Sequence, residues 1–340
     1  MTAVETQKAP RNTVLGAIDT FVNRHASVLP TAAAAAILVV LLVGANIRFE
    51  GRFLTPGNLS ALLLNNSFLM VLAVGMTFVI VTSGIDLSVG SVMAFTGIFG
   101  ASLLSGGVPA FVVIPTMLVS GALIGLLIGV LVQYFNVQPF IASLAGLFLG
   151  RGLAYVVSLQ SIRVEDPVVL WLQSTRFRLG DWYITPTGII ALLVVIIGAL
   201  VMQFTRFGRT VYAVGGSESS AQLMGLKVAR TKVMVYVISG FCGGLAGLLL
   251  TAFSGAGYPR NGIGTELDVI ATVVIGGTLL AGGRGYVLGS MIGVFVFATI
   301  TTIISFMGAE QSWTHIIVGG LLLLFIVVQR AIVARTSRTG

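Results

Sequence analysis

One carboxylate stands inside a strongly apolar stretch of the chain. Asp86 is the only charged residue of FVIVTSGIDLSVGSVMAF, and Gly84 and Gly90 flank it. A charged side chain at the centre of a bilayer costs about 2.5–3.5 kcal/mol on insertion scales, so Asp86 needs hydrogen-bond partners or water. A helix break between the glycines lets Asp86 or Ser88 cap a new helix that starts near Leu87. We expect this structural role; contact with a transported solute or a gating ion pair are the alternatives.

Other polar residues lie in or beside apolar runs. Thr265 and Asp268 in GTELDVIATVVIGG have the spacing of a capping box, which predicts a second helix start. Arg151 either binds helix-end carbonyls, extends to the interface or lines a solute path. Asn65 and Asn66 are able to hydrogen-bond a polyhydroxylated solute, although bonding between helices is their commoner use in membranes. The candidate residues of a solute path are Asn65, Asn66, Asp86, Arg151 and Asp268.

Reactive residue types are otherwise sparse. Cys242 is the one cysteine, and the two histidines, His25 and His315, lie far apart in sequence, so neither a disulfide within the chain nor a metal cluster is predicted. The serines near Asp86 show no nucleophile–base spacing. None of the lysines follows a glycine, so there is no P-loop and any ATP must be hydrolysed on another subunit. We predict a chain that is not an enzyme and binds no cofactor or metal itself.

The elements that must hold these residues are transmembrane helices. The 340 residues are 56% hydrophobic and 9% charged, far from the soluble average of about a quarter charged. A hydrocarbon core of roughly 30 Å needs about 20 apolar residues per helix, and about ten apolar runs meet this need. We therefore predict an all-α integral membrane protein with about ten transmembrane helices. They are expected at Leu29–Ile47, Leu59–Thr82, Leu87–Leu104, Val108–Tyr134, Phe140–Ser158, Pro186–Phe204, Val233–Phe253, Leu267–Leu280, Val287–Met307 and Trp313–Val328.

The order of these crossings relates the two carboxylates to each other. Asp86 precedes the third crossing and Asp268 precedes the eighth, so they enter the membrane from opposite faces. This arrangement predicts broken helices near both residues and a five-plus-five inverted repeat, as in many transporters.

The basic residues set the predicted orientation. Most of them fall in one set of loops when the N-terminus is placed inside, which puts both termini in the cytoplasm. Their scatter between apolar runs explains the net charge of +8 without a nucleic-acid partner. We predict a cytoplasmic segment 1–28, a membrane domain 29–330 with a cytoplasmic loop 205–232, and a cytoplasmic tail 331–340. The outer connection 158–185 is expected to lie on the membrane surface or to meet a periplasmic partner.

Two local patterns predict helix contacts. Glycines recur at four-residue spacing in one crossing, at Gly121 and Gly125, and in another, at Gly240 and Gly244, which indicates close helix packing. In the cytoplasmic loop, the stretch GGSESSAQLMG predicts a short helix capped by its first serine and ended by its last glycine. That helix has little core of its own, so it lies on lipid or contacts a partner.

Three stretches also carry a family resemblance. GMTFVIVTSGIDLSVGSVMAFTG, RFGRTVYAVGGSESSAQLMGLKV and ELDVIATVVIGGTLLAGGRGYVLG resemble the permease subunits of bacterial ribose-type sugar ABC importers, over roughly residues 59–330. Within that family, SIRVEDP, TRFGRTVYAVGG, AQLMG and GGTLLAGG are most similar to permease chains of galactofuranose importers. The resemblance implies an inner-membrane protein that works with a second permease chain, either a copy or a homologue. It also implies two ATP-binding subunits that hold ATP and Mg, and a periplasmic sugar-binding protein.

The resemblance also assigns a role to the short cytoplasmic helix, as the coupling helix that docks on the ATPase. Gly215, Gly216, Leu223 and Gly225 match the family pattern, whereas Ser217 stands where asparagine is common. Both residue types cap helices, so the helix is expected to form. The residues implied in coupling are Gly215, Gly216, Ser217, Glu218, Gln222, Leu223, Met224 and Gly225.

Three functions are compatible with the residues. The preferred one is an ABC permease that moves sugar by alternating access and binds it weakly along the path. An ion-coupled secondary transporter is the second, with Asp86 as the proton or sodium site. An integral membrane enzyme is the third, and it lacks a recognisable nucleophile and base.

Overall fold

The computed structural model describes residues 29–310 and 312–336, so the predicted segment 1–28 lies outside the described residues. Nine of the ten predicted crossings each fall on one helix, and the second, Leu59–Thr82, falls on two, α3 and α4. Most helix termini lie within a few residues of the predicted ones, but α12 begins five residues earlier, α13 ends five residues earlier and α15 ends eight residues later. The helices are α2 Leu29–Arg48, α3 Pro56–Asn65, α4 Ser67–Val81, α5 Val89–Ser105, α6 Ala110–Tyr134, α7 Pro139–Val157, α8 Pro167–Ser174, α9 Pro186–Phe204, α10 Arg206–Gly216, α11 Glu218–Leu223, α12 Val228–Ser254, α13 Thr265–Ile275, α14 Val287–Phe306 and α15 Ser312–Thr336.

The count of ten full crossings is not confirmed. Within residues 29–310 and 312–336, six helices are long and apolar enough to span a membrane, namely α2, α6, α7, α9, α12 and α14. The pair α3 and α4 makes a seventh if it counts as one span bent by 53°, and α5 and residues 312–327 of α15 are shorter apolar helices. The predicted eighth crossing is α13, whose 11 residues extend about 16 Å at 1.5 Å per residue. That length covers only about half of the hydrocarbon core, so α13 is not a full crossing by itself.

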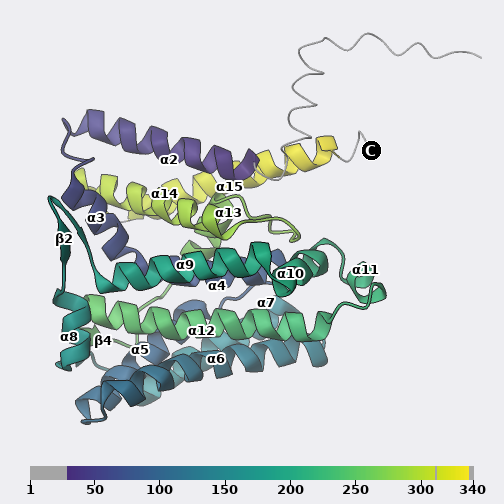
Figure 1. Ribbon diagram of the computed structural model, residues 1–340, viewed down its shortest axis with the longest axis horizontal. Coiled ribbons are helices and arrows are strands. Elements are labelled where there is room, and N and C mark those ends of the chain that lie inside the picture. Colours follow the sequence, from purple (N-terminus) through teal and green to yellow (C-terminus); the bar gives the residue numbers. More distant parts are fainter. Residues whose placement is uncertain (1–28, 311, 337–340) are drawn as a thin grey trace, which may run out of the picture.

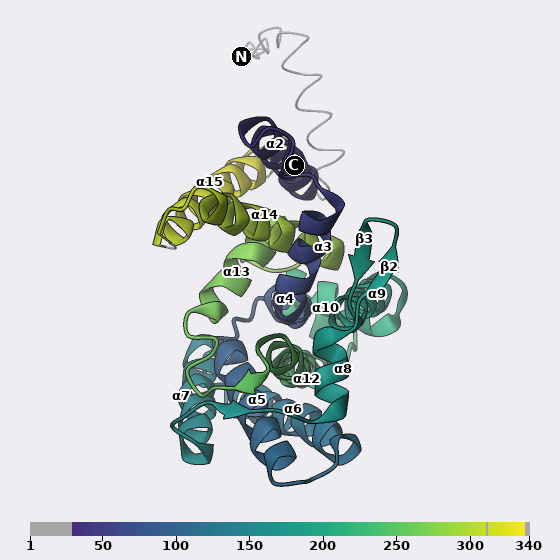
Figure 2. The ribbon, with the colours of Figure 1, turned by 90° about the vertical axis from the view of Figure 1, so that its left-hand side faces the viewer.

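Viewed nearly along the helix axes, the helices form two groups on either side of α4 (Figure 2). One group holds α5, α6, α7 and α12, and the other holds α2, α14 and α15. All residues of α4 except Phe68 are buried, because the helix is apolar around its whole circumference and is covered on every side. The inverted repeat stays a prediction.

Glycines allow α12 to pack closely on two of its faces. A Cβ added at Gly240 would collide with the carbonyl oxygen of Gly121, and one at Gly244 would lie 2.6 Å from the carbonyl oxygen of Met117. The predicted close packing at these glycines is therefore confirmed, and the structure shows that it joins α6 to α12. On another face of α12, a Cβ at Gly243 would lie 2.8 Å from the side chain of Val92 in α5. Small residues bring the three helix backbones together where lipid gives no hydrophobic drive for association.

Four short strands depart from the all-α prediction, and they lie at one end of the bundle (Figure 1). The antiparallel pair of β1 (Ile162–Arg163) and β4 (Ala256–Gly257) joins the connection 158–185 to the segment after α12. The hairpin of β2 (Phe177–Leu179) and β3 (Trp182–Ile184) follows α8. The opposite end carries α10 and α11 (Figure 1), so the two long polar connections lie at opposite ends of the bundle, as predicted.

Candidate functional site

The turn between α4 and α5 holds Asp86, whose exposed fraction is only 1%. Its Oδ1 accepts hydrogen bonds from the Ser88 N–H at 2.9 Å and from the Ser88 hydroxyl at 2.6 Å. Its Oδ2 accepts a bond of 2.7 Å from the hydroxyl of Ser239 in α12. Both carboxylate oxygens are therefore bonded to protein donors, and Asp86 joins the start of α5 to α12.

The local structure differs in detail from the expected cap. α5 begins at Val89 rather than near Leu87, and Ser88 holds the cap position without a side-chain capping bond. The bond from Asp86 to the Ser88 N–H still satisfies a free donor ahead of the helix, which is the physical role that the sequence predicts. The turn itself packs on Tyr236 of α12, because a Cβ at Gly84 would lie 2.8 Å from the Tyr236 hydroxyl oxygen.

Asn65 and Asn66 mark the bend between α3 and α4. The axes of these helices differ by 53°, and Asn66 is both the C-cap of α3 and the N-cap of α4. The Asn66 amide donates to the carbonyl oxygen of Leu62 at 2.9 Å, so it satisfies the backbone at the bend. A pocket of about 440 Å³ opens here between α3 and α14. Its polar lining residues are Asn58, Asn65, Asn66, Thr301, Thr302 and Ser305.

Arg151 connects α7 to the loop that leads into α13. Its Nη1 donates to the carbonyl oxygens of Pro259 at 2.7 Å and Asn261 at 2.8 Å. Of the three predicted roles, carbonyl binding is therefore observed, with loop carbonyls in place of those at a helix end. These two bonds hold the loop against α7 next to the start of α13.

The predicted capping box at the start of α13 is wrong. The N-cap is Gly264, with φ of +84°, and no side chain forms a capping bond there. The prediction made Thr265 the N-cap, whereas Thr265 is the first residue of the helix, so α13 begins one residue earlier than expected. Glycine adopts the left-handed conformation of this N-cap without the strain that other residues would have. Asp268 instead faces His315 of α15, with 3.8 Å between its Oδ1 and the imidazole Nδ1.

Glu266, in the first turn of α13, was not among the predicted site residues. Its Oε2 is buried and has no hydrogen-bond partner among the described residues. The start of α5 approaches it closely, because a Cβ at Gly90 would lie 2.6 Å from that oxygen. The starts of α5 and α13 are therefore adjacent. Both oxygens of Asp86 near the start of α5 are hydrogen-bonded, whereas Glu266 at the start of α13 has an oxygen without a partner among the described residues. Gly90 was the sequence feature that indicated a close approach here, but a glycine does not identify the residue that approaches it.

The short helix predicted in the loop 205–232 forms. α11 covers Glu218–Leu223, Ser217 is its N-cap with a bond of 3.3 Å from the Ser220 N–H, and Gly225 follows with φ of +73°. Glu218 accepts bonds of 3.0 Å at both carboxylate oxygens from Lys232 of α12. Gln222 lines a pocket beside this ion pair. Leu223 and Met224 are 89% and 67% exposed, so the helix presents apolar side chains away from the bundle.

The segment before α11 contacts the end of α4. A Cβ at Gly215 would collide with the carbonyl oxygen of Val81, whereas a Cβ at Gly216 would meet nothing within 4 Å. The Gly283 N–H donates to that same Val81 oxygen at 2.9 Å. The hydroxyl of Ser83 donates to the Ala281 carbonyl at 2.8 Å and lies 3.4 Å from that of Gly215. The α10–α11 segment is thus joined to the turn that contains Asp86.

The chemistry available at these places is hydrogen bonding and charge pairing. No group of three or more His, Cys, Asp or Glu residues within the described ranges is arranged to hold a metal ion. The geometry supports helix caps, polar pockets and an exposed apolar helix, and we assign no nucleophile or general base.

Comparison with known proteins agrees with a membrane transport component. Residues 58–326 match the family described as the branched-chain amino acid transport system / permease component. The chain is 42% identical over 314 residues to the fructose import permease protein FruG of Bifidobacterium longum, covering 90% of this chain and 92% of the relative. It is 44% identical over 274 residues to the inner membrane ABC transporter permease protein YjfF of Escherichia coli, covering 80% and 83%. It is 36% identical over 298 residues to the ribose import permease protein RbsC of Escherichia coli, covering 86% and 91%.

Proposed function

The chain belongs to the ribose-type permeases of sugar ABC importers, within the branched-chain amino acid transport system / permease component family, and from this premise we propose that it carries galactofuranose across the inner membrane. The relatives named for fructose and ribose support a monosaccharide as the solute class. Galactofuranose rests on the resemblance of SIRVEDP, TRFGRTVYAVGG, AQLMG and GGTLLAGG. Both termini are placed in the cytoplasm on the distribution of basic residues.

The chain acts in this proposal as one half of a transmembrane path. A second permease chain completes the path, two ATP-binding subunits hydrolyse ATP with Mg, and a periplasmic protein delivers the sugar. The pocket at the bend between α3 and α4 supplies amide and hydroxyl groups of the kind that bind sugar hydroxyls. Such a path must bind weakly, because a solute held tightly would not be released.

The observation that carries the coupling role is the contact between Gly215 and Val81. α11 exposes Leu223 and Met224, and these apolar side chains suit docking on an ATPase subunit. A displacement of α11 then passes through the backbone contact at Gly215 to the end of α4. The adjoining turn holds Asp86, which links α5 to α12, so the movement reaches the packed helices of the bundle.

Uptake by reconstituted protein tests the function. Proteoliposomes would contain this chain, its second permease and its ATPase subunits, with the sugar-binding protein outside, and uptake of galactofuranose, ribose and fructose would be compared. We expect ATP-dependent uptake with galactofuranose preferred. Preference for another of the sugars would contradict the proposed solute, and uptake on an ion gradient without the ATPase would favour a secondary transporter with Asp86 as its ion site.

Neighbouring glycines supply a matched test of coupling. Gly215→Ala places a methyl group against the Val81 carbonyl, whereas Gly216→Ala meets open space. We expect Gly215→Ala to abolish most sugar-stimulated ATP hydrolysis while the ATPase subunits still bind, and Gly216→Ala to remain close to the parent. Deletion of residues 217–225 should abolish uptake while the chain still inserts. Equal effects of the two alanine variants would argue against coupling through Gly215.

A further inference from the structure

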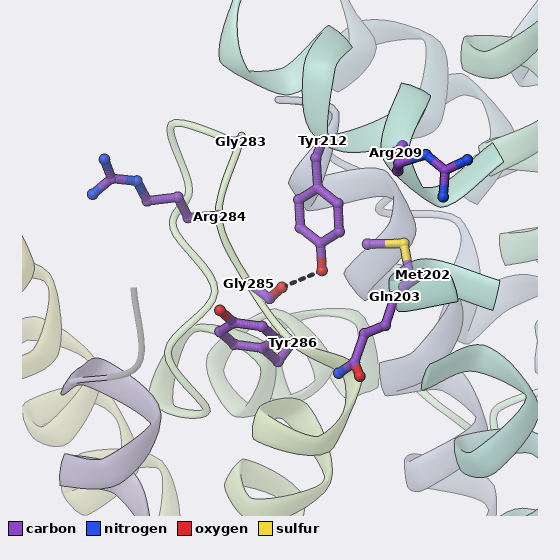
Figure 3. A pocket seen from close by; sticks show the side chains of 8 residues that line it. All are labelled: Met202, Gln203, Arg209, Tyr212, Gly283, Arg284, Gly285 and Tyr286. Carbon is purple, nitrogen blue, oxygen red and sulfur yellow. Dashed lines mark hydrogen bonds between the residues drawn. The ribbon is translucent and has the colours of Figure 1, made fainter. Parts of the chain in front are cut away.

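A pocket with two arginines in its lining lies between the end of α9, α10 and the loop before α14 (Figure 3). It has a volume of about 360 Å³, within the range of about 300–1,000 Å³ that holds small ligands. Gln203 comes from the last turn of α9, Arg209 and Tyr212 come from α10, and Arg284 and Tyr286 come from the loop before α14. None of the proposed path residues lines it, so it is separate from the solute route.

The charge of this pocket favours an anion. Arg209 and Arg284 both line it, and none of its eight lining residues, all within the described ranges, is acidic. The two arginine side chains extend in opposite directions, with Tyr212 between them (Figure 3). Guanidinium groups bind phosphate oxygens through two parallel hydrogen bonds, which makes a phosphate group the anion best matched to this lining.

Most of the polar groups in the pocket are free for a ligand. The Tyr212 hydroxyl donates to the Gly285 carbonyl at 2.7 Å, and this bond holds the Tyr212 ring in place as one wall of the pocket. Burial and the neighbouring Tyr286 raise the pKa of Tyr212 to about 12, so the wall stays neutral near pH 7. The side chains of Gln203, Arg209 and Arg284 are exposed and form no hydrogen bond with another described residue. They are able to turn toward a bound group.

The position of the pocket at the ends of two spanning helices favours a lipid as the source of the phosphate. Two spanning helices meet it at their ends, since α9 ends at Phe204 and α14 begins at Val287. Phe204 is 71% exposed and Leu288 is 47% exposed, so exposed apolar side chains of two spanning helices lie directly beside lining residues. Tyrosine and arginine are typical of this interfacial level, and basic pockets between helices on the cytoplasmic side bind acidic headgroups.

α10 packs its apolar face on the bundle and keeps its basic side chains outside. Gly208, Val211 and Val214 are buried, with Val211 in the main hydrophobic core, whereas Arg206 and Arg209 are exposed. Exposed basic side chains near a membrane surface attract anionic headgroups. We propose that the pocket between α9, α10 and the loop before α14 binds the phosphate of an anionic phospholipid.

Lipid binding to the purified full-length chain tests this site. Native mass spectrometry would measure the retention of phosphatidylglycerol and phosphatidylcholine by the parent and by a double variant, Arg209→Gln with Arg284→Gln. We expect the parent to prefer phosphatidylglycerol and the double variant to bind it roughly 25-fold more weakly, about fivefold for each charge removed. Arg209→Lys with Arg284→Lys should restore part of the binding. The matched control is Arg52→Gln with Arg178→Gln, two exposed arginines on the loop before α3 and on β2, at the other end of the bundle.

The outcomes separate a lipid from a free anion. Loss of phosphatidylglycerol binding in the pocket variant alone, with no competition from millimolar inorganic phosphate or glycerophosphoglycerol, supports the lipid site. Full competition by either soluble phosphate would overturn the lipid assignment. Equal loss in the control variant, or equal retention of the two lipids by the parent, would overturn the site itself. Thermal unfolding in lipid-free detergent checks that each variant is folded.

Discussion

The starts of α5 and α13 lie side by side, but the carboxylates at the two places differ in their hydrogen bonding. At α5, both oxygens of Asp86 accept bonds, one of them from Ser239 of α12. At α13, Glu266 has a buried oxygen without a partner among the described residues, and Asp268 has a single contact of 3.8 Å with His315. The same sequence pattern, an acid ahead of an apolar run, therefore gives different results. The carboxylate is fully hydrogen-bonded at the start of α5, whereas no carboxylate is fully hydrogen-bonded to described residues at the start of α13.

The difference arises from the neighbouring helix. α12 approaches α5 through glycines and brings a serine hydroxyl to Asp86, whereas α13 begins at Gly264 with no side-chain cap. Segments with few buried apolar contacts open more easily than densely packed ones. The first four residues of α13 include no buried residue, whereas residues 89–94 of α5 are all buried. We infer that the α5 start belongs to the stable packed group and that the α13 start is the easier of the two to displace.

The largest expected effect follows from removal of the bonded carboxylate. Asp86→Ala leaves the hydroxyls of Ser88 and Ser239 without their acceptor, so we expect a loss of about 3–5 kcal/mol in the free energy of unfolding. Equilibrium unfolding in mixed detergent micelles would measure it. Asp181→Ala, at an exposed residue in the β2–β3 turn, is the matched control and should change stability by less than about 0.5 kcal/mol. A similar loss in both variants would contradict a specific contribution of the Asp86 hydrogen bonds to stability.

A methyl group between the two starts should have the next largest effect. A Cβ at Gly90 would lie 2.6 Å from Glu266 Oε2 and from the Gly262 carbonyl oxygen, so Gly90→Ala forces α5 and α13 apart. We expect about 1–3 kcal/mol of destabilisation, together with faster hydrogen exchange in α13 than in α5. Gly57→Ala, in the first turn of α3 with nothing within 4 Å, is the control. Faster exchange in α5 instead would reverse the assignment of the movable start.

Glu266→Gln should have little effect on stability, in contrast to Asp86→Ala. The buried oxygen of Glu266 has no donor to lose, and a neutral amide is easier to bury than a carboxylate. We expect the free energy of unfolding to change by less than about 1 kcal/mol, with no consistent loss. Glu310→Gln, at an exposed residue, provides the comparison. A loss as large as that of Asp86→Ala would mean that Glu266 is held as firmly as Asp86.

The smallest effect is expected at Asp268. Its contact with His315 is long, and the histidine side chain is 68% exposed, so solvent screens the pair. A double-mutant cycle of Asp268→Asn and His315→Gln should give a coupling free energy below about 1 kcal/mol. A larger coupling would show that α13 and α15 are fixed to each other more strongly than the geometry suggests.

Much of the architecture could be predicted because it depends on local chemistry. Apolar runs of about 20 residues form helices in a bilayer, since every backbone polar group must be satisfied within the segment. The α11 cap at Ser217 and the stop at Gly225 were equally local. By contrast, the run after Asp268 reads as a crossing, but α13 ends at Ile275, and Gly277 follows with φ of +98°.

The class of protein, the positions of the apolar helices, the cap of α11 and the glycine faces of α6 and α12 could all be read from the amino-acid sequence. Which polar groups meet depends instead on the packing of distant segments. Asp86 and Ser239 are separated by 153 residues, and Arg151 bonds carbonyls more than 100 residues away. The pocket of Arg209 and Arg284 likewise joins two distant segments. Propensity and hydropathy act over one or two helical turns, whereas contacts of this kind depend on how whole helices pack, which no single segment encodes.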